Sequence, residues 1–264
     1  MFSPRKRGVI RAHGGDPMRT FKFDRDPYGF VMYRKGRLTL EPGVTILIGC
    51  NGAGKTTMLH CLEGELKRKD IPTLLFSNLR DGGKQSISVL LESRRNNLAA
   101  SMATASEGEG ILISLGRLLE TVRGFLSTGK DAMHKSDFLD FIAAWNDDSD
   151  GDFEQKKKSI ADRRKECKER WILIDGCDSG YSIDNIVDLK ELFPLIMADA
   201  EKEGKDLYIV ISANSYELAS GERCYDVSTG TFCTPKTYKS YRKRILASRE
   251  RKNARVMEEE DDED

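Results

Sequence analysis

One run of eight residues constrains this 264-residue chain more than any other part of the sequence. Residues 49–56 read Gly-Cys-Asn-Gly-Ala-Gly-Lys-Thr and fit the phosphate-binding loop pattern GxxxxGK(S/T). The apolar run 44–48 precedes the loop and the helix-like segment 57–62 follows it, which is the strand–loop–helix context that the pattern requires. A chance match in a glycine-containing loop is the alternative, and this context disfavours it. The sequence therefore predicts a nucleotide phosphate as the central ligand.

Each residue of this loop has an expected task. Glycines let successive backbone N–H groups converge on phosphate oxygens, and the helix that follows points its positive end at them. Lys55 would bridge the β- and γ-phosphates, and Thr56 would supply a hydroxyl ligand to Mg²⁺. The predicted contacts to nucleotide and metal come from Gly49, Asn51, Gly52, Ala53, Gly54, Lys55, Thr56 and Thr57.

Composition and charge divide the chain into three parts. Charged residues make up 33% of it and hydrophobic residues 39%, which is more polar than an average globular chain and indicates solvated segments outside a core. We expect a flexible basic leader over residues 1–17, with Met18 as an alternative start, and a single ATP-binding domain over residues 18–235. A basic segment with a purely acidic end would follow over residues 236–264.

The sequence favours a cytoplasmic protein. No apolar run approaches the roughly 20 residues that span a bilayer, and residues 1–16 lack the apolar core of a signal peptide. The six cysteines form no CxxC pair, which favours reduced thiols. His13, His60 and His134 are too scattered to indicate a zinc site.

Apolar periodicity predicts an α/β fold with a mostly parallel core sheet. Residues 171–174 and 207–211 are continuous apolar runs typical of buried parallel strands, and the helix-like segment 186–200 joins them. Short alternations over residues 20–40 predict two or three strands ahead of the loop. We also expect a strand at 73–76, helices at 86–103, 111–126 and 138–145, and a charged, solvated helix at 156–170.

Two aspartates follow the apolar run at residues 171–174. Asp175 ends that run, where a Walker-B aspartate would hold magnesium through its hydration shell, although an ordinary strand-ending aspartate is the alternative. Asp178 lies in the turn beyond it.

In these motifs the chain resembles the ATP-binding heads of the ABC superfamily, including the SMC-like and the phage and bacterial AAA-type ATP-binding proteins. Residues 49–57 match Walker A, Ser106-Glu107-Gly108-Glu109 the signature motif, residues 172–175 Walker B and residues 178–184 the D-loop. The resemblance covers residues 20–232. It implies a P-loop NTPase fold with an N-terminal antiparallel β part and a short helical subdomain at about residues 80–145.

The resemblance also implies how such a head works. Ser106, Gly108 and Glu109 would contact the ATP that is bound to a second subunit, so that a homodimer, or a dimer with a related head, forms around Mg²⁺ and ATP. Only about 50 residues separate Walker A from the signature motif, so the chain has no room for coiled-coil arms. We expect no membrane domain fused to the head, so a transport role would need a separate permease.

Several positions depart from the family pattern. Gly176 stands where the family carries the glutamate that polarises the attacking water, and loss of a general base costs about 10²- to 10⁴-fold in rate. Asp178 is the nearest substitute, although a D-loop role suits it better. Asn214 replaces the switch histidine and lacks its positive charge. Gln85 is the expected metal-sensing glutamine with Asn78 as its rival, and Tyr28, Phe30 or Tyr33 could stack on adenine or simply belong to the core.

The basic segment at residues 236–255 admits three interpretations. Its nine lysines and arginines, with Tyr238 and Tyr241 between them, could meet nucleic-acid phosphates. A protein partner could bind it instead. It could also be a solvated helix that packs Ile245 and Leu246 on the head or is neutralised by the acidic end.

Three functions remain open at this stage. The leading one is an ABC-type ATPase head that couples nucleotide state to a partner in DNA metabolism or phage–host conflict, a setting that rests on family analogy. The second is an ATP-dependent switch or assembly module with little or no hydrolysis. The third is a small-molecule phosphotransferase, which would need an acceptor pocket and would not dimerise on ATP.

Overall fold

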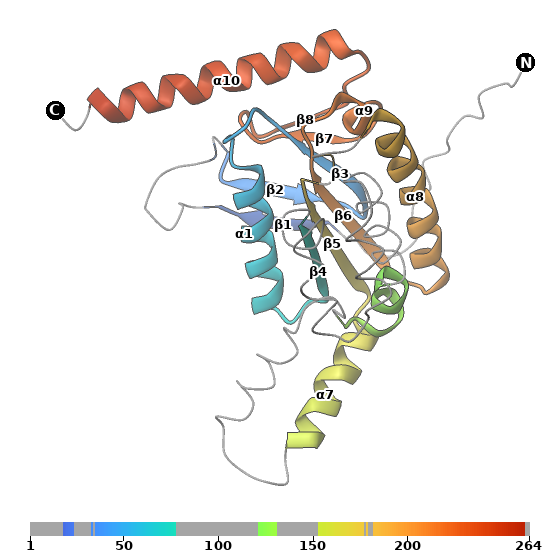
Figure 1. Cartoon of the computed structure of the whole chain (residues 1–264). Coiled ribbons are helices and arrows are strands. Elements are labelled where there is room, and N and C mark those ends of the chain that lie inside the picture. Colours follow the sequence, from blue (N-terminus) through green and yellow to red (C-terminus); the bar gives the residue numbers. More distant parts are fainter. Residues whose placement is uncertain are drawn as a thin grey trace, which may run out of the picture.

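The fold of the computed structural model is built on a six-stranded sheet. The structure describes residues 18–23, 33, 35–77, 121–130, 153–176, 178 and 182–261. The strand order is β4-β5-β6-β3-β7-β8, in which β8 alone pairs antiparallel to its neighbour (Figure 1). These strands are β3 (Gly43–Ile48), β4 (Thr73–Ser77), β5 (Glu169–Asp175), β6 (Asp206–Ser212), β7 (Cys224–Asp226) and β8 (Thr231–Cys233). The predicted α/β class with a mostly parallel sheet is confirmed.

Alternating side chains of the central strands form two separate cores. In β5, Ile172 and Ile174 join one hydrophobic cluster, while Trp171 and Leu173 join the other. Successive side chains of a strand point to opposite faces, so a fully apolar strand indicates a sheet covered on both sides. The uninterrupted apolar runs in the sequence have this origin.

One face of the sheet is covered by α1 (Lys55–Arg68) and by the antiparallel pair β1 (Arg19–Lys22) and β2 (Arg37–Leu40). Trp171 stacks on Tyr208 with the ring centroids 4.0 Å apart, and Phe21 of β1 meets the edge of the indole. Arg19 Nε donates to both carboxylate oxygens of Glu169 at 2.9 Å, which ties β1 to the start of β5. The predicted antiparallel β part ahead of the loop is present.

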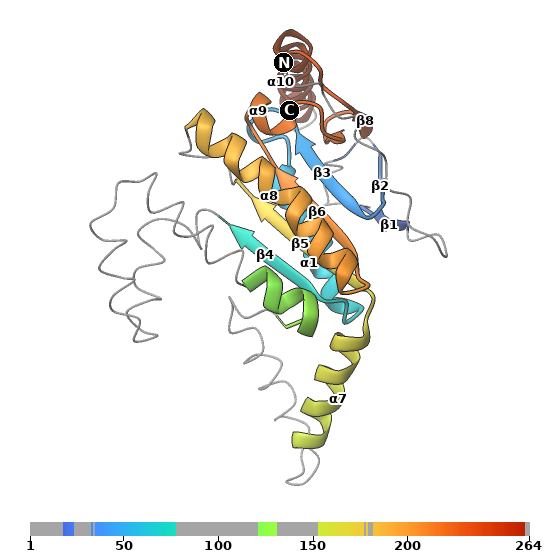
Figure 2. The same cartoon turned by 90° about the vertical axis from the view of Figure 1, so that its right-hand side faces the viewer.

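The other face carries α8 (Ile183–Lys202), α9 (Tyr216–Ala219) and a helical segment at 121–128 (Figure 2). The last helix, α10 (Tyr238–Asp261), adds Tyr241 and Ile245 to the same cluster. In both views α10 lies beyond the carboxyl ends of the parallel strands, whereas α7 (Phe153–Glu166) extends from their amino ends. Within the described residues, no helix is long and apolar enough to cross a membrane.

Most predicted elements are confirmed, with one shifted boundary. The predicted charged helix at 156–170 ends at Glu166, and β5 already begins at Glu169. Arg170 looks like part of a solvated helix in the sequence but is a fully buried strand residue. Of the helix predicted at 111–126, residues 121–126 are described and helical, and the helices predicted at 86–103 and 138–145 lie outside the described residues.

Candidate functional site

The loop between β3 and α1 has the backbone geometry of a phosphate cradle. Gly54 caps the N-terminus of α1 with φ +92° and its carbonyl accepts from the Met58 N–H at 2.9 Å. Gly52 has φ +75°, a left-handed conformation that disfavours residues with a Cβ atom. The loop therefore needs glycine at these two positions because of its backbone angles. The N-terminus of α1, which carries the positive end of the helix dipole, points into the loop.

Lys55 folds back over this loop. Its ammonium donates to the carbonyls of Gly49 at 2.9 Å and Cys50 at 3.1 Å, and the side chain is buried. Burial lowers the pKa of Lys55, and the Cys50 thiol, Asp178 and Asp175 offset part of this effect. A poorly hydrated ammonium held by two carbonyls stands to gain from an anionic ligand.

Thr56 and Asp175 meet across 119 residues of sequence. The Thr56 hydroxyl donates to Asp175 Oδ1 at 3.0 Å, and the Ser212 hydroxyl donates to the same oxygen at 2.5 Å. Ser212 Oγ also accepts from the Gly176 N–H at 2.9 Å. The loop after β3 and the ends of β5 and β6 therefore share one polar network at the carboxyl edge of the sheet, where ligands of open α/β sheets bind.

The oxygens of Thr56 and Asp175 fit a magnesium ion. Mg²⁺ prefers hard oxygen ligands and commonly takes one or two from the protein and the rest from water and phosphate. Bound there, the ion would neutralise charge on the phosphate oxygens. Asp175 and Thr56 would hold it, and Ser212 would orient the carboxylate.

Asp178 joins the β5 turn to the loop after β6. Its Oδ2 accepts from the backbone N–H groups of Asn214 at 2.6 Å and Ser215 at 2.5 Å, while Oδ1 is buried and has no partner among the described residues. A carboxylate held this way fixes the loop that carries Asn214. Two residues before Asp178, Gly176 has φ +62°, so a glutamate at that position would be strained.

Of the remaining candidates from the sequence, the structure describes only Tyr33. Tyr33 is buried, packs against Phe23 and donates from its hydroxyl to the Gly54 carbonyl at 2.8 Å. It therefore supports the loop from the core side, as expected for a core tyrosine. Asn78, Gln85, Tyr28, Phe30 and the signature residues Ser106, Gly108 and Glu109 lie outside the described residues.

Residues of β6 and α10 at the site were missed in the sequence. Ser212 ends a strand as Asp175 does, so its place at a strand end was the available signal. From α10, the Tyr241 hydroxyl donates to the Asn214 carbonyl at 2.7 Å, and Ser248 and Lys252 contact the phosphate loop. Ile245 lies on the same helix face and packs on the head, which was one of the interpretations of this segment, but the sequence gives no signal for the polar contacts of the other three residues.

Comparisons with known proteins add little to this geometry. No family model matches the chain, and no curated protein matches it. One similar solved structure is the ADP conformation of an ATP-binding cassette of an ABC transporter, with 13% sequence identity and a TM-score of 0.40. The match covers 89% of this chain and 96% of that one. The functional assignment therefore rests on the arrangement of the residues themselves.

Proposed function

We propose that this chain is an ATP-binding, ABC-type ATPase head that binds ATP with Mg²⁺ at the carboxyl edge of its sheet. The observation that carries the proposal is the hydrogen bond from the Thr56 hydroxyl to Asp175 Oδ1, because it joins the phosphate loop to a metal-binding carboxylate. Lys55 would neutralise the β- and γ-phosphates, and Asp175 and Thr56 would hold the metal. Asn214 and Asp178 would form the part of the site that faces the γ-phosphate.

The proposal extends to a dimer that forms around ATP. The resemblance in residues 106–109 predicts that a second subunit completes the site. Support comes from the first turns of α8, which begins within the predicted D-loop at residues 178–184. Ile183 is 64% exposed there and Val187 is 46% exposed. These residues lie one turn apart on the same helix face, as expected for an apolar surface that a partner covers.

Light scattering tests the dimer. We expect the wild-type chain to change from monomer to dimer when ATP and Mg²⁺ are added. Ile183→Asp should stay monomeric and still bind ATP, because it places a charge in the interface without touching the phosphate loop. Leu195→Asp is the matched control, since Leu195 is 62% exposed near the other end of the same helix. A wild-type chain that stays monomeric with bound ATP would contradict the dimer and leave the binding site intact.

Gly176 favours a second function, an ATP-dependent switch that scarcely hydrolyses its nucleotide. Gly176 has no basic side chain, and Oδ2 of Asp178 already accepts from the backbone N–H groups of Asn214 and Ser215. We expect phosphate release at a rate about 10²-fold or more below that of an ATPase with a general base. Phosphate release measured with Asp178→Asn beside the wild type decides between the two functions. Fast release that needs Asp178 would favour the ATPase with Asp178 as base, and fast release that survives the change would assign the base to another group.

A further inference from the structure

The face of α10 that meets the head combines an apolar first part with a polar second part. Tyr241, Ile245, Ser248 and Lys252 follow one another at intervals of four, three and four residues, which places them on one side of a helix. In that order they contact the Asn214 carbonyl, the hydrophobic core, the Cys50 N–H and the Asn51 carbonyl. The helix therefore runs from the loop after β6 to the phosphate loop (Figure 1).

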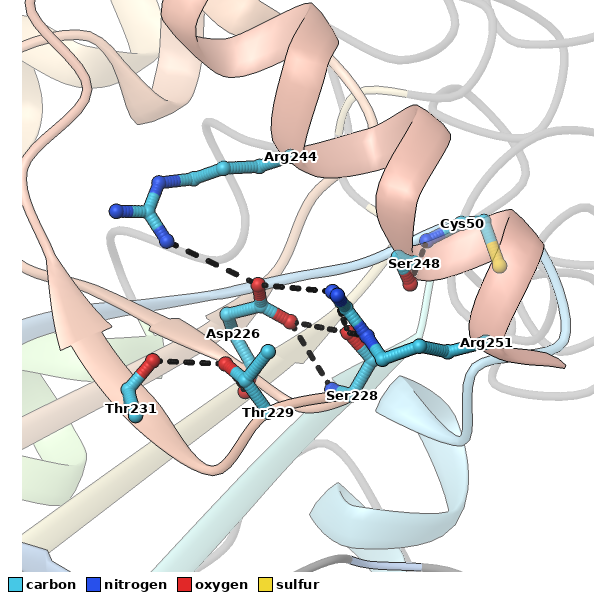
Figure 3. Close-up of polar contacts among 8 residues, drawn as sticks. All are labelled: Cys50, Asp226, Ser228, Thr229, Thr231, Arg244, Ser248 and Arg251. Carbon is cyan, nitrogen blue, oxygen red and sulfur yellow. Dashed lines mark hydrogen bonds and ion pairs between the residues drawn. The ribbon is translucent and has the colours of Figure 1, made fainter.

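Ion pairs with the end of β7 hold α10 in this place. Asp226 is 1% exposed and its Oδ1 accepts from the backbone N–H and the hydroxyl of Ser228 at 3.0 and 2.6 Å. Its Oδ2 lies 3.7 Å from Arg251 Nη2 and 4.0 Å from Arg244 Nη1, both on α10 (Figure 3). Arg251 Nη2 also donates to the Ser228 hydroxyl at 2.9 Å. Two arginines on one buried carboxylate fix the helix on the sheet edge.

Ser248 ties the helix directly to the phosphate loop. Its hydroxyl is the acceptor for the Cys50 N–H at 3.1 Å, and both residues are buried (Figure 3). A buried N–H group requires such an acceptor. The position of the loop therefore depends on α10.

Lys252 lies one turn further along α10, beside the exposed loop residues Asn51 and Gly52. Its ammonium is 3.3 Å from the Asn51 carbonyl, and a Cβ atom added to Gly52 would lie 2.6 Å from it. Lys55 holds the two preceding carbonyls, of Gly49 and Cys50, so two lysines from different helices hold three successive carbonyls. Lys252 is exposed, so its ammonium is accessible to a ligand.

We propose that Lys252 is a second phosphate-binding lysine of the nucleotide site, delivered by α10 and directed at the terminal phosphate of a nucleoside triphosphate. This inference rests on the proposed function. Because the helix is fixed, only the four-carbon side chain of Lys252 moves. When a nucleotide binds, the Lys252 ammonium leaves the Asn51 carbonyl for a phosphate oxygen, as the Lys55 ammonium leaves the Gly49 and Cys50 carbonyls. The ligand class is a nucleoside polyphosphate, and the preference is for three phosphates over two.

Nucleotide titrations of single variants test Lys252. We expect Lys252→Ala to weaken ATP binding about tenfold and ADP binding at most about threefold, because the lost charge faces the terminal phosphate. Lys252→Arg should retain most of the affinity, and the effect should shrink as salt is raised. Lys243→Ala removes the same charge from an exposed position of the same helix and should leave both affinities unchanged within about twofold.

Ser248→Ala distinguishes phosphate contact from loop support. This change removes the acceptor of the Cys50 N–H but no charge. The affinities for ATP and for ADP should therefore fall to the same extent, independently of salt. Equal losses of ATP and ADP in Lys252→Ala would reduce Lys252 to such a supporting role and overturn the proposal. Wild-type affinity for ATP in Lys252→Ala would overturn it as well. A wild-type chain that binds no nucleotide would instead overturn the proposed function itself.

Discussion

Replacing Lys55 by alanine is expected to abolish nucleotide binding, with a loss of at least about a hundredfold in affinity for ATP. Hydrogen bonds to charged groups contribute about 1.5–3 kcal/mol each, and a hundredfold loss corresponds to about 2.8 kcal/mol. The ammonium is buried against the Gly49 and Cys50 carbonyls and no other described lysine reaches these two atoms. Isothermal titration calorimetry with ATP and Mg²⁺ measures the loss.

Lys67→Ala is the control for this experiment. Lys67 lies in the last turn of the same helix, its side chain is 52% exposed, and it pairs with Glu63 at 2.7 Å. Such exposed pairs contribute at most about 1 kcal/mol to stability. Because Lys67 lies at the opposite end of α1 from the loop, its loss should not change the affinity for ATP. Unchanged ATP affinity in the Lys55 variant would contradict the assignment of this loop as the phosphate-binding site.

Arg170→Met is expected to cause a large loss of stability, about 3 kcal/mol or more in the free energy of unfolding. Arg170 is 0% exposed, and burial lowers the pKa of its guanidinium. No described carboxylate pairs with it, and backbone carbonyls at the end of the 121–128 helix and around the α7–β5 junction satisfy its N–H groups instead. These are the carbonyls of Phe125, Leu126, Lys165, Cys167 and Glu169, at 2.7–3.3 Å.

The reason for the large effect is that methionine fills the space and offers no donor. Each buried carbonyl left without a partner costs about 1–3 kcal/mol. Urea unfolding followed by circular dichroism measures the change. Arg163→Met is the control, because Arg163 is 64% exposed and lies 3.8 Å from Asp70 in an exposed ion pair. Equal unfolding midpoints for the two variants would show that Arg170 does not hold these elements together.

The same residue shows where prediction from the sequence stops. Strands and helices with an apolar period were predicted correctly, since β5 and β6 are buried on both faces and read as continuous apolar runs. Arg170 reads as solvated because sequence periodicity treats a charge as exposed. Its burial depends on carbonyls that come from residues 125–169 and that only the fold brings together.

The candidate site divides in the same way. Lys55, Thr56 and Asp175 were predictable because a local motif and a strand end identify them. The structure places Thr56 in contact with Asp175, and Lys55 against the loop carbonyls. Ser248 and Lys252 were not predictable, because about 200 residues separate them from the loop that they touch and hydrophobic periodicity does not record polar contacts. Of the three interpretations of the basic helix, packing on the head is the one that the structure bears on. Ile245 packs against the core, Leu246 is exposed, and Ser248 and Lys252 contact the loop at residues 49–56.

The most direct test of the central claim is a calorimetric titration of the wild-type chain with ATP, ADP and AMP in the presence of Mg²⁺. In the proposed site the loop, Lys55 and the metal would act on the β- and γ-phosphates. ATP and ADP should therefore bind, and AMP should bind at least about a hundredfold more weakly. Omitting Mg²⁺ should weaken the binding of ATP, because the ion that Asp175 and Thr56 would hold is then missing. AMP binding as tight as ATP binding, or no binding of ATP at all, would contradict the account.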